Sequence, residues 1–293
     1  MVIRQVGKPV NKLPEEISVP ASGTAWELYN SLASQASTSE HRLRVTKGSD
    51  GAFVPNNKDL KLESTGLREQ STIYVKDLGP QIAWRTVFLV EYAGPLFIHP
   101  LVFTFLVSPQ ASYLQTLSLT LVCLHFLKRE LETLFIHRFS SATMPAFNIF
   151  KNSAHYWVLS GLNMAYWIYR PRAPAAEASN PYITYTGLAL FTIGELGNLS
   201  NHITLRNLRS SGSTERGIPQ GLGFNLVTCP NYMFEAIAWA GIALVSWSLS
   251  TVIFAIAAIG QMGVWAKKKE SRYRKEFGSR YSKKRYAMLP FIW

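Results

Sequence analysis

Three glutamates stand inside apolar stretches of this 293-residue chain, at Glu91, Glu195 and Glu235. A charged side chain at membrane depth is costly unless it is paired or reaches water, so such residues are usually functional. Each glutamate is therefore a candidate for proton transfer or ligand binding. The alternative interpretation is that each one ties neighbouring helices together through hydrogen bonds.

Polar side chains recur around Glu195 at the spacing of an α-helix. Asn198, His202, Arg206 and Arg209 follow it at intervals of three or four residues, and residues so spaced share one helix face. A polar stripe that becomes cationic toward one end suits a ligand with a polar body and an anionic end. The same stripe is also what a helix end at a membrane interface would show.

Two further polar faces are predicted on separate helices. They are formed by Asn231, Glu235 and Trp239, and by His125, Arg129 and Glu132. Three polar faces on three helices predict an internal cavity that opens to the cytosol.

The sequence has none of the common soluble motifs for phosphate or acyl chemistry. Residues 217–223 (GIPQGLG) form neither a dinucleotide-binding glycine turn nor a P-loop. No G-x-S-x-G elbow occurs, and no Cys/His spacing fits a zinc site, so no metal is expected. A dinucleotide would therefore have to be held by side chains between helices.

The elements that would position these residues follow Gly79 and Pro80, where the composition becomes apolar. Six apolar stretches are found at residues 84–107, 112–127, 147–168, 182–205, 233–249 and 251–266. They predict an all-α membrane bundle of about six transmembrane helices, although several are shorter than the roughly 20 residues of a full span. Lys and Arg gather in alternate connecting segments and in the tail, which places both termini in the cytosol.

The first part of the chain has the composition of a soluble domain, with 11 Lys/Arg and 9 Asp/Glu in residues 1–85. Alternating apolar residues predict strands at 2–6, 17–19, 43–45 and 72–75, and Thr24 can cap a helix over 25–36. This order resembles the ubiquitin-like β-grasp fold. We therefore divide the chain into a small α+β domain, 1–78, and a membrane domain, 79–293.

The formal net charge of +12 comes mainly from segments that flank the apolar stretches and from the tail. Such a distribution is typical of membrane flanks attracted to anionic lipid, so membrane lipid is an expected partner. Nucleic acid is not expected, because it would require a basic face on a folded domain.

From Asn198 onward the sequence resembles the steroid 5-alpha-reductase superfamily. The resemblance rests on N-L-S-N-H-I-T-L-R-N-L-R (198–209), G-I-P-Q-G (217–221), N-Y-M-F-E (231–235) with Trp239, and the tail Y-R-K-E-F-G-S-R-Y (273–281). Within the superfamily the chain is most similar to the trans-2-enoyl-CoA reductases of very-long-chain fatty acid elongation. The ubiquitin-like start and residues 79–96 and 128–157 support that branch.

The resemblance implies NADPH as cofactor, bound by the C-terminal helices and loops. The matching cofactor-binding positions are Asn198, His202, Arg209, Asn231, Glu235, Trp239 and Tyr273. The steroid branch has an aspartate where this chain has His202.

The resemblance also implies two catalytic residues. Glu91 matches the catalytic glutamate of the superfamily, whereas the catalytic tyrosine of the steroid branch matches Phe126, which lacks the hydroxyl. Enoyl reductases of this type use the tyrosine of N-Y-x-x-E, which is Tyr232 here. Tyr232 is therefore expected to donate the proton to C2, while Glu91 either orients Tyr232 or polarises the thioester carbonyl.

The implied reaction is reduction of the 2,3 double bond of very-long-chain trans-2-enoyl-CoA in the endoplasmic reticulum membrane. It is the last step of the elongation cycle, so the condensing enzyme, ketoacyl reductase and dehydratase are expected partners. One alternative is a steroid or polyprenol reductase of the same superfamily. Another is a methyltransferase that uses S-adenosylmethionine, because the tail also resembles that of isoprenylcysteine methyltransferases. The last is a scaffold that presents a ubiquitin-like domain.

Overall fold

The structure, a computed structural model, describes residues 1–20, 22–107, 110–139, 142–177, 180–208, 217–281 and 285–292. The chain divides into two compact units. The N-terminal unit is Met1–Trp84 with Ser141–Asn148, and the helical unit is Arg85–Ser140 with Ile149–Trp293.

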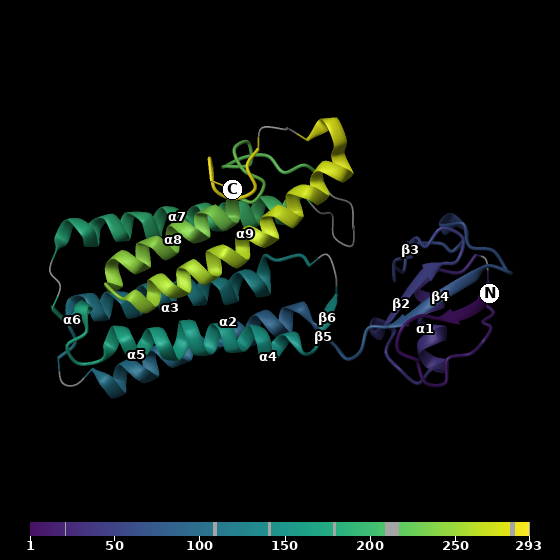
Figure 1. Ribbon diagram of the computed structural model, residues 1–293, viewed down its shortest axis with the longest axis horizontal. Helices are drawn as coiled ribbons and strands as arrows, with labels where there is room; N and C mark the ends of the chain where they lie inside the picture. Colours follow the sequence, from purple (N-terminus) through teal and green to yellow (C-terminus); the bar gives the residue numbers. More distant parts are fainter. Residues whose placement is uncertain are drawn as a thin grey trace. The chain divides into compact units, whose positions relative to one another are not determined.

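A four-stranded sheet and one long helix form most of the N-terminal unit (Figure 1). The strands lie in the order β1-β4-β2-β3, where β1 is Val2–Gln5, β2 is Leu43–Lys47, β3 is Phe53–Val54 and β4 is Thr72–Asp77. β1 and β4 are parallel, and the other neighbours are antiparallel. Short 3-10 turns occur at η1 (Glu40–Arg42) and η2 (Glu63–Thr65).

Helix α1 (Ala25–Gln35) is capped by Thr24, as its sequence predicts. The Thr24 hydroxyl accepts from the Glu27 backbone, and the Glu27 carboxylate accepts from the Thr24 backbone, which completes a capping box. The apolar face of α1 packs with the sheet in one core, in which Leu28 and Leu32 are fully buried.

The strand predicted at residues 17–19 is wrong. A single bridge pairs Val2 with Glu16, and the Ile17 amide donates to the Met1 carbonyl, but no ladder continues from there. Pro14 and Pro20 bracket this segment, and proline has no N–H to extend a ladder. The segment therefore covers the sheet edge without becoming a strand.

Two short strands that lie far apart in sequence pair in the same unit. β5 (Gln81–Ala83) and β6 (Thr143–Pro145) are antiparallel. The Ala146 amide donates to the Pro80 carbonyl at 2.8 Å, which continues the pairing by one step.

The helical unit contains long helices and one π-helical segment (Figure 1). In chain order these are α2 (Trp84–Leu106), α3 (Tyr113–Phe135), α4 (Asn148–Ser153), the π-helix Ala154–Asn163, α5 (Met164–Tyr169), α6 (Pro174–Glu177), α7 (Pro181–Asn207), α8 (Pro230–Ser246), α9 (Leu249–Phe277) and the turn η4 (Gly278–Arg280). Each of the six predicted apolar stretches coincides with helical structure. Among the described helices, two are long and apolar enough to cross a membrane, α2 and the helix that begins at Leu249.

Helices α7 and α8 approach each other closely because glycine lies at their contact. A Cβ atom on Gly194 would lie 2.4 Å from the Ala238 backbone nitrogen, and one on Gly241 would lie 2.5 Å from the Gly187 carbonyl oxygen. Small residues at such a contact let two helix backbones pack directly. The contact fixes the α7 and α8 polar faces relative to each other.

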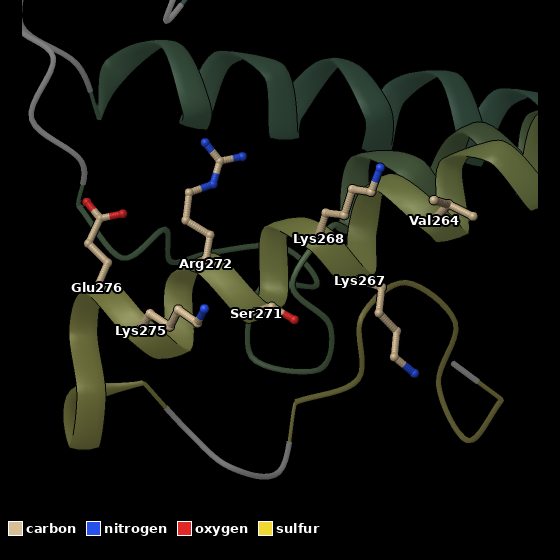
Figure 2. Close-up of a pocket in the computed structure, with 7 residues that line it drawn as sticks. All are labelled: Val264, Lys267, Lys268, Ser271, Arg272, Lys275 and Glu276. Carbon is tan, nitrogen blue, oxygen red and sulfur yellow. The ribbon is translucent and has the colours of Figure 1, made fainter. Parts of the chain in front are cut away.

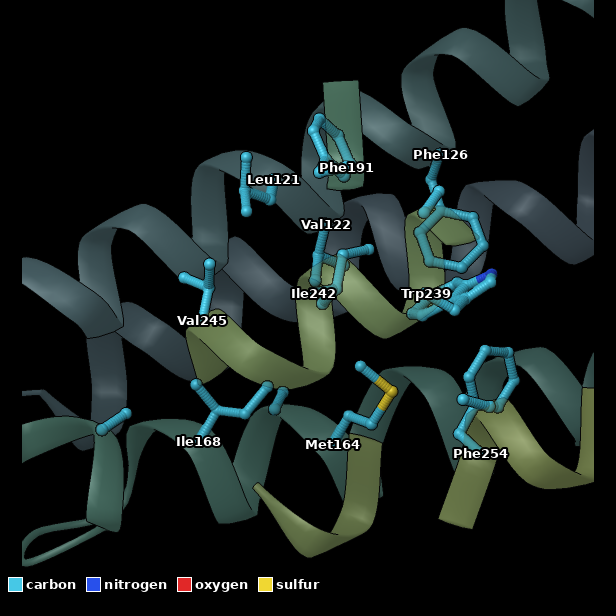
Figure 3. Packing of buried hydrophobic residues seen from close by; sticks show 14 of the residues in the cluster. Leu121, Val122, Phe126, Met164, Ile168, Phe191, Trp239, Ile242, Val245 and Phe254 are labelled. Atoms are coloured by element: carbon cyan, nitrogen blue, oxygen red, sulfur yellow. The ribbon is translucent and has the colours of Figure 1, made fainter. Parts of the chain in front are cut away.

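The core of the helical unit is assembled from α3, α5, α7, α8 and α9 (Figure 3). Val122, Phe126, Met164, Ile242 and Val245 are fully buried there. Trp239 of α8 lies against Phe254 of α9, with ring centroids 4.6 Å apart. Phe126 and Trp239 of this core also contact the ring of His125, one of the polar residues described next.

Candidate functional site

Polar side chains from α3, α7 and α8 meet inside the helical unit. We call this set the polar cluster, which consists of His125, Lys128, Arg129, Glu132, Glu195, Asn198, His202 and Glu235. The α3 members share one face because they are spaced by three or four residues. Helix α3 starts at a capping box between Ser112 and Gln115, which sets the position of that face.

His125 lies between two carboxylates. Its Nδ1 atom is 2.5 Å from Glu195 Oε1, and its Nε2 atom is 3.3 Å from Glu235 Oε1. The His125 side chain is only 2% exposed. The imidazole therefore joins α7 to α8, and both of its nitrogens are committed.

Lys128 and Arg129, each in an ion pair, complete the α3 face. Lys128 Nζ is 2.7 Å from Glu195 Oε2 and donates to Asn198 Oδ1, also at 2.7 Å. Arg129 donates from Nη1 to Glu132 Oε2 at 2.6 Å and from Nη2 to the Tyr92 hydroxyl at 3.0 Å. Each cation thus has a carboxylate, which offsets the cost of burying it.

Asn198 connects α7 to the start of α8. Its Nδ2 atom donates to the Asn231 backbone oxygen and to Glu235 Oε2, both at 2.9 Å. The Asn231 side-chain oxygen is buried and has no hydrogen-bond partner among the described residues. One buried amide oxygen therefore remains able to accept a hydrogen bond.

Glu132, His137 and His202 could hold a metal ion by composition, since their ligand atoms lie within 4.8 Å of one another. Glu132 Oε2 is 3.0 Å from His202 Nδ1, and His137 Nε2 is 3.4 Å from the same nitrogen. The Arg129 guanidinium already lies against both Glu132 and His202. A metal would have to displace this cation, so the group is better described as an arginine-centred ion-pair network.

An aromatic wall lies beside the polar cluster. Phe126 contacts Tyr92, Tyr156 and Trp239 at centroid distances of 6.3, 6.1 and 6.0 Å. Glu91 of α2 is buried next to Tyr92 and Asn152, and its Oε2 atom has no hydrogen-bond partner among the described residues. Glu91 therefore reaches the polar cluster through Tyr92, whose hydroxyl binds Arg129.

Tyr232 follows Asn231 on α8 and points about 100° away from it around the helix axis. It packs against an apolar group from α9 and the C-terminal segment that includes Met262 and Met288. No described contact joins Tyr232 to Glu91, and its hydroxyl has no hydrogen-bond partner among the residues described. The role of Glu91 in orienting Tyr232 stays a prediction.

The remaining predicted residues separate from the polar cluster or fall outside the description. Tyr273 is buried against Phe277 and Tyr281, and no described contact joins it to the cluster. Arg209 lies outside the described residues. The structure does bring together five of the predicted residues, Asn198, His202, Asn231, Glu235 and Trp239. Trp239 belongs to this group because its ring centroid lies 4.8 Å from that of His125.

Sequence reasoning missed two tyrosines of the aromatic wall. Tyr92 follows Glu91 directly, and its hydroxyl accepts a hydrogen bond from Arg129. A search for charged residues does not find it, because tyrosine is uncharged. Tyr156 lies within the π-helix, and such segments often occur at functional sites. A tyrosine next to an intramembrane glutamate was the available signal for Tyr92.

Sequence comparisons with known proteins show the family of this chain. A family model described as 3-oxo-5-alpha-steroid 4-dehydrogenase matches residues 142–293. A very-long-chain enoyl-CoA reductase of Dictyostelium discoideum is 41% identical and covers 99% of each chain. A putative enoyl reductase of Schizosaccharomyces pombe is 43% identical over 98% of this chain and 97% of its own length. A probable very-long-chain enoyl-CoA reductase of Caenorhabditis elegans is 43% identical over 81% of each chain. This chain therefore belongs to the 3-oxo-5-alpha-steroid 4-dehydrogenase family, in the branch of the very-long-chain enoyl-CoA reductases.

Proposed function

We propose that this protein reduces the 2,3 double bond of very-long-chain trans-2-enoyl-CoA with NADPH, as the last step of fatty acid elongation. The observation that carries the proposal is the polar cluster, which lies beside an aromatic wall inside an otherwise apolar bundle. The chain is similar over nearly its whole length to a protein named very-long-chain enoyl-CoA reductase. Such an enzyme needs a place where a polar surface meets an apolar one. A polar cofactor and an apolar acyl chain have to meet there.

The polar cluster fits a dinucleotide in its chemistry. Its amide and charged side chains can hydrogen-bond a cofactor, and the unpartnered Asn231 oxygen can accept from a carboxamide. We assign cofactor binding to Asn198, His202, Arg209, Asn231, Glu235, Trp239 and Tyr273. NADPH would supply the hydride for C3 of the substrate.

The chain's own residues would stabilise the charge on the thioester oxygen and deliver a proton to C2. Tyr232 is the proposed proton donor, because its hydroxyl is uncommitted among the described residues. Glu91, as the protonated acid, is the proposed donor to the thioester oxygen, because it is buried with one oxygen unpartnered; as a carboxylate it would instead orient Tyr232. A donor aimed at an oxygen that becomes negative stabilises the transition state more than the substrate.

The chain is a helical membrane protein. We further propose six spans in the endoplasmic reticulum membrane with both termini in the cytosol, because basic residues gather in alternate loops. The N-terminal unit, with one helix on a mixed four-stranded sheet, supports a ubiquitin-like assignment. Its partners would be the other enzymes of the elongation cycle.

The direct test is NADPH oxidation by the purified protein with a long-chain trans-2-enoyl-CoA. We expect wild-type protein to oxidise NADPH, and Tyr232→Phe and Glu91→Gln each to lose about 100-fold in kcat, the usual effect of removing a proton donor. Tyr113→Phe and Glu177→Gln are matched controls, because both side chains are exposed and lie outside the polar cluster. They should keep wild-type rates.

Each outcome separates the alternatives. Full activity in Tyr232→Phe would remove this residue as the proton donor and leave Glu91 or water. A wild-type protein that binds NADPH but oxidises none with any enoyl-CoA would refute the substrate. Steroid and polyprenol substrates would be tested next. Binding of S-adenosylmethionine instead of NADPH would favour the methyltransferase.

A further inference from the structure

A basic groove of about 830 Å³ lies along α9, away from the polar cluster. It is lined by Val264, Lys267, Lys268, Ser271, Arg272, Lys275 and Glu276. Figure 2 shows Lys268 and Arg272 extending to the same side of α9. The volume lies within the range of small-molecule sites, and four of the seven lining side chains are cationic.

Three of the cations that line this groove have no ion pair within the described part of the chain. Lys268, Arg272 and Lys275 are spaced by four and three residues, so they share a helix face. None of the three has a carboxylate within ion-pair distance among the described residues, although Arg274 on another face pairs with Glu270 at 2.5 Å. Like charges at this spacing repel one another, and a bound anion would relieve that repulsion.

The groove starts where α9 stops being apolar. Residues 249–266 of this helix contain no Asp, Glu, Lys or Arg, and Lys267 begins the basic part. A helix that changes in this way crosses from hydrocarbon to the headgroup region at the change. The groove therefore lies where the polar end of an amphipathic substrate would emerge from the membrane.

The groove is also separate from the cofactor position predicted on the same helix. Tyr273 is buried against Phe277 and Tyr281, with Lys269 Nζ 5.6 Å from the centre of its ring. The residues that line the groove are exposed instead. One helix thus presents a buried aromatic face and an open cationic face.

We propose that this groove binds the phosphates of the coenzyme A portion of the substrate, an inference that rests on the proposed function. Coenzyme A carries a 3′-phosphate and a diphosphate, with a total charge of about −4. The four cations and Glu276 give the groove a net charge of +3 from its residue types. A phospholipid headgroup offers one phosphodiester in most cases and would leave much of this charge unmatched.

The first test measures binding without turnover. Calorimetric titration of the full-length protein in detergent with coenzyme A is compared with 3′-dephospho-coenzyme A. We expect the Lys268→Gln/Arg272→Gln variant to bind coenzyme A at least about tenfold more weakly than wild type. It should also lose the preference for the 3′-phosphate. Arg4→Gln/Lys76→Gln is the matched control, since it removes two exposed cations from the N-terminal unit.

The second test separates the groove from the chemistry. With the enoyl-CoA substrate, the groove variant should show a raised KM, an unchanged kcat and an unchanged KM for NADPH. With an enoyl-pantetheine thioester, which has no nucleotide, wild type and variant should be equal. A variant that is equally impaired with both substrates would overturn the proposal, because the loss would then be structural.

The remaining alternative is that the groove binds a lipid headgroup, and the groove variant would then give a different result. Loss of binding to phosphatidylcholine vesicles that contain phosphatidylserine, with unchanged affinity for coenzyme A, would refute our assignment. If wild-type protein binds coenzyme A through the groove but reduces no enoyl-CoA, the proposed function fails while the groove assignment stands.

Discussion

Replacing Glu195 by glutamine would test whether the polar cluster is held by its ion pairs. Glu195 contacts His125 at 2.5 Å and Lys128 at 2.7 Å, and its side chain is 12% exposed. Removing one partner of a buried pair costs about 3–5 kcal/mol because the remaining charge is uncompensated. Here His125 and Lys128 each keep a second carboxylate, Glu235 at 3.3 Å from His125 and Glu132 at 3.4 Å from Lys128. We therefore expect Glu195→Gln to lower the free energy of unfolding by about 2 kcal/mol.

The measurement is reversible unfolding in mixed micelles, followed by tryptophan fluorescence. Glu177→Gln is the control, because Glu177 is exposed on α6 and should change stability by less than about 0.5 kcal/mol. Adding Lys128→Met to Glu195→Gln should cost less than the sum of the two single changes, because the pair couples. Additive losses, or a Glu195→Gln loss no larger than that of the control, would show that these ion pairs do not stabilise the bundle.

Two further predictions concern packing and pH. Gly194→Ala should lower the free energy of unfolding by about 1–3 kcal/mol, because its Cβ would lie 2.4 Å from the backbone nitrogen of Ala238. Gly260→Ala is the control, because the space around Gly260 is open, and it should leave that free energy unchanged or raise it. Unfolding titrations measure both. In the N-terminal unit the Arg42 guanidinium, 2.6 Å from Asp77, holds the pKa of that carboxyl below its ordinary 3.8. The stabilisation is therefore present above pH 4 and is lost as the pH falls through the lowered pKa. Asp77→Asn should reduce hydrogen-exchange protection of β2 and β4 by about 1 kcal/mol at pH 7, and a difference that persists at pH 2 would contradict this cause.

The apolar stretches located the helices well but ended α3 and α9 too early, since α9 continues from the predicted end at residue 266 to Phe277. The apolar stretch at residues 112–127 stops before Lys128, whereas α3 continues to Phe135. The continuation is charged in sequence, yet Glu132 is 1% exposed because its partners lie on the same and a neighbouring helix. A hydropathy pattern counts every charged residue as polar, even where a neighbouring helix neutralises the charge. The predicted apolar stretch therefore ended before the helix does.

Spacing predicted which polar residues share a helix face, but not which faces meet. His125, Arg129 and Glu132 form one face as expected, and their pairing with Glu195 and His202 depends on tertiary packing. A single-residue step also matters, since successive helix residues point about 100° apart. For this reason Tyr232 packs toward α9 although its neighbour Asn231 lies beside Asn198.

The small β5–β6 sheet constrains how the chain can thread a bilayer. β5 directly precedes α2, and β6 follows α3, yet the two strands are hydrogen-bonded neighbours. Their pairing means that the polypeptide must leave and return on one side, so the segment between them crosses an even number of times. If α2 traverses the membrane, α3 has to bring the chain back, even though α3 alone is not apolar enough to be recognised as a crossing helix.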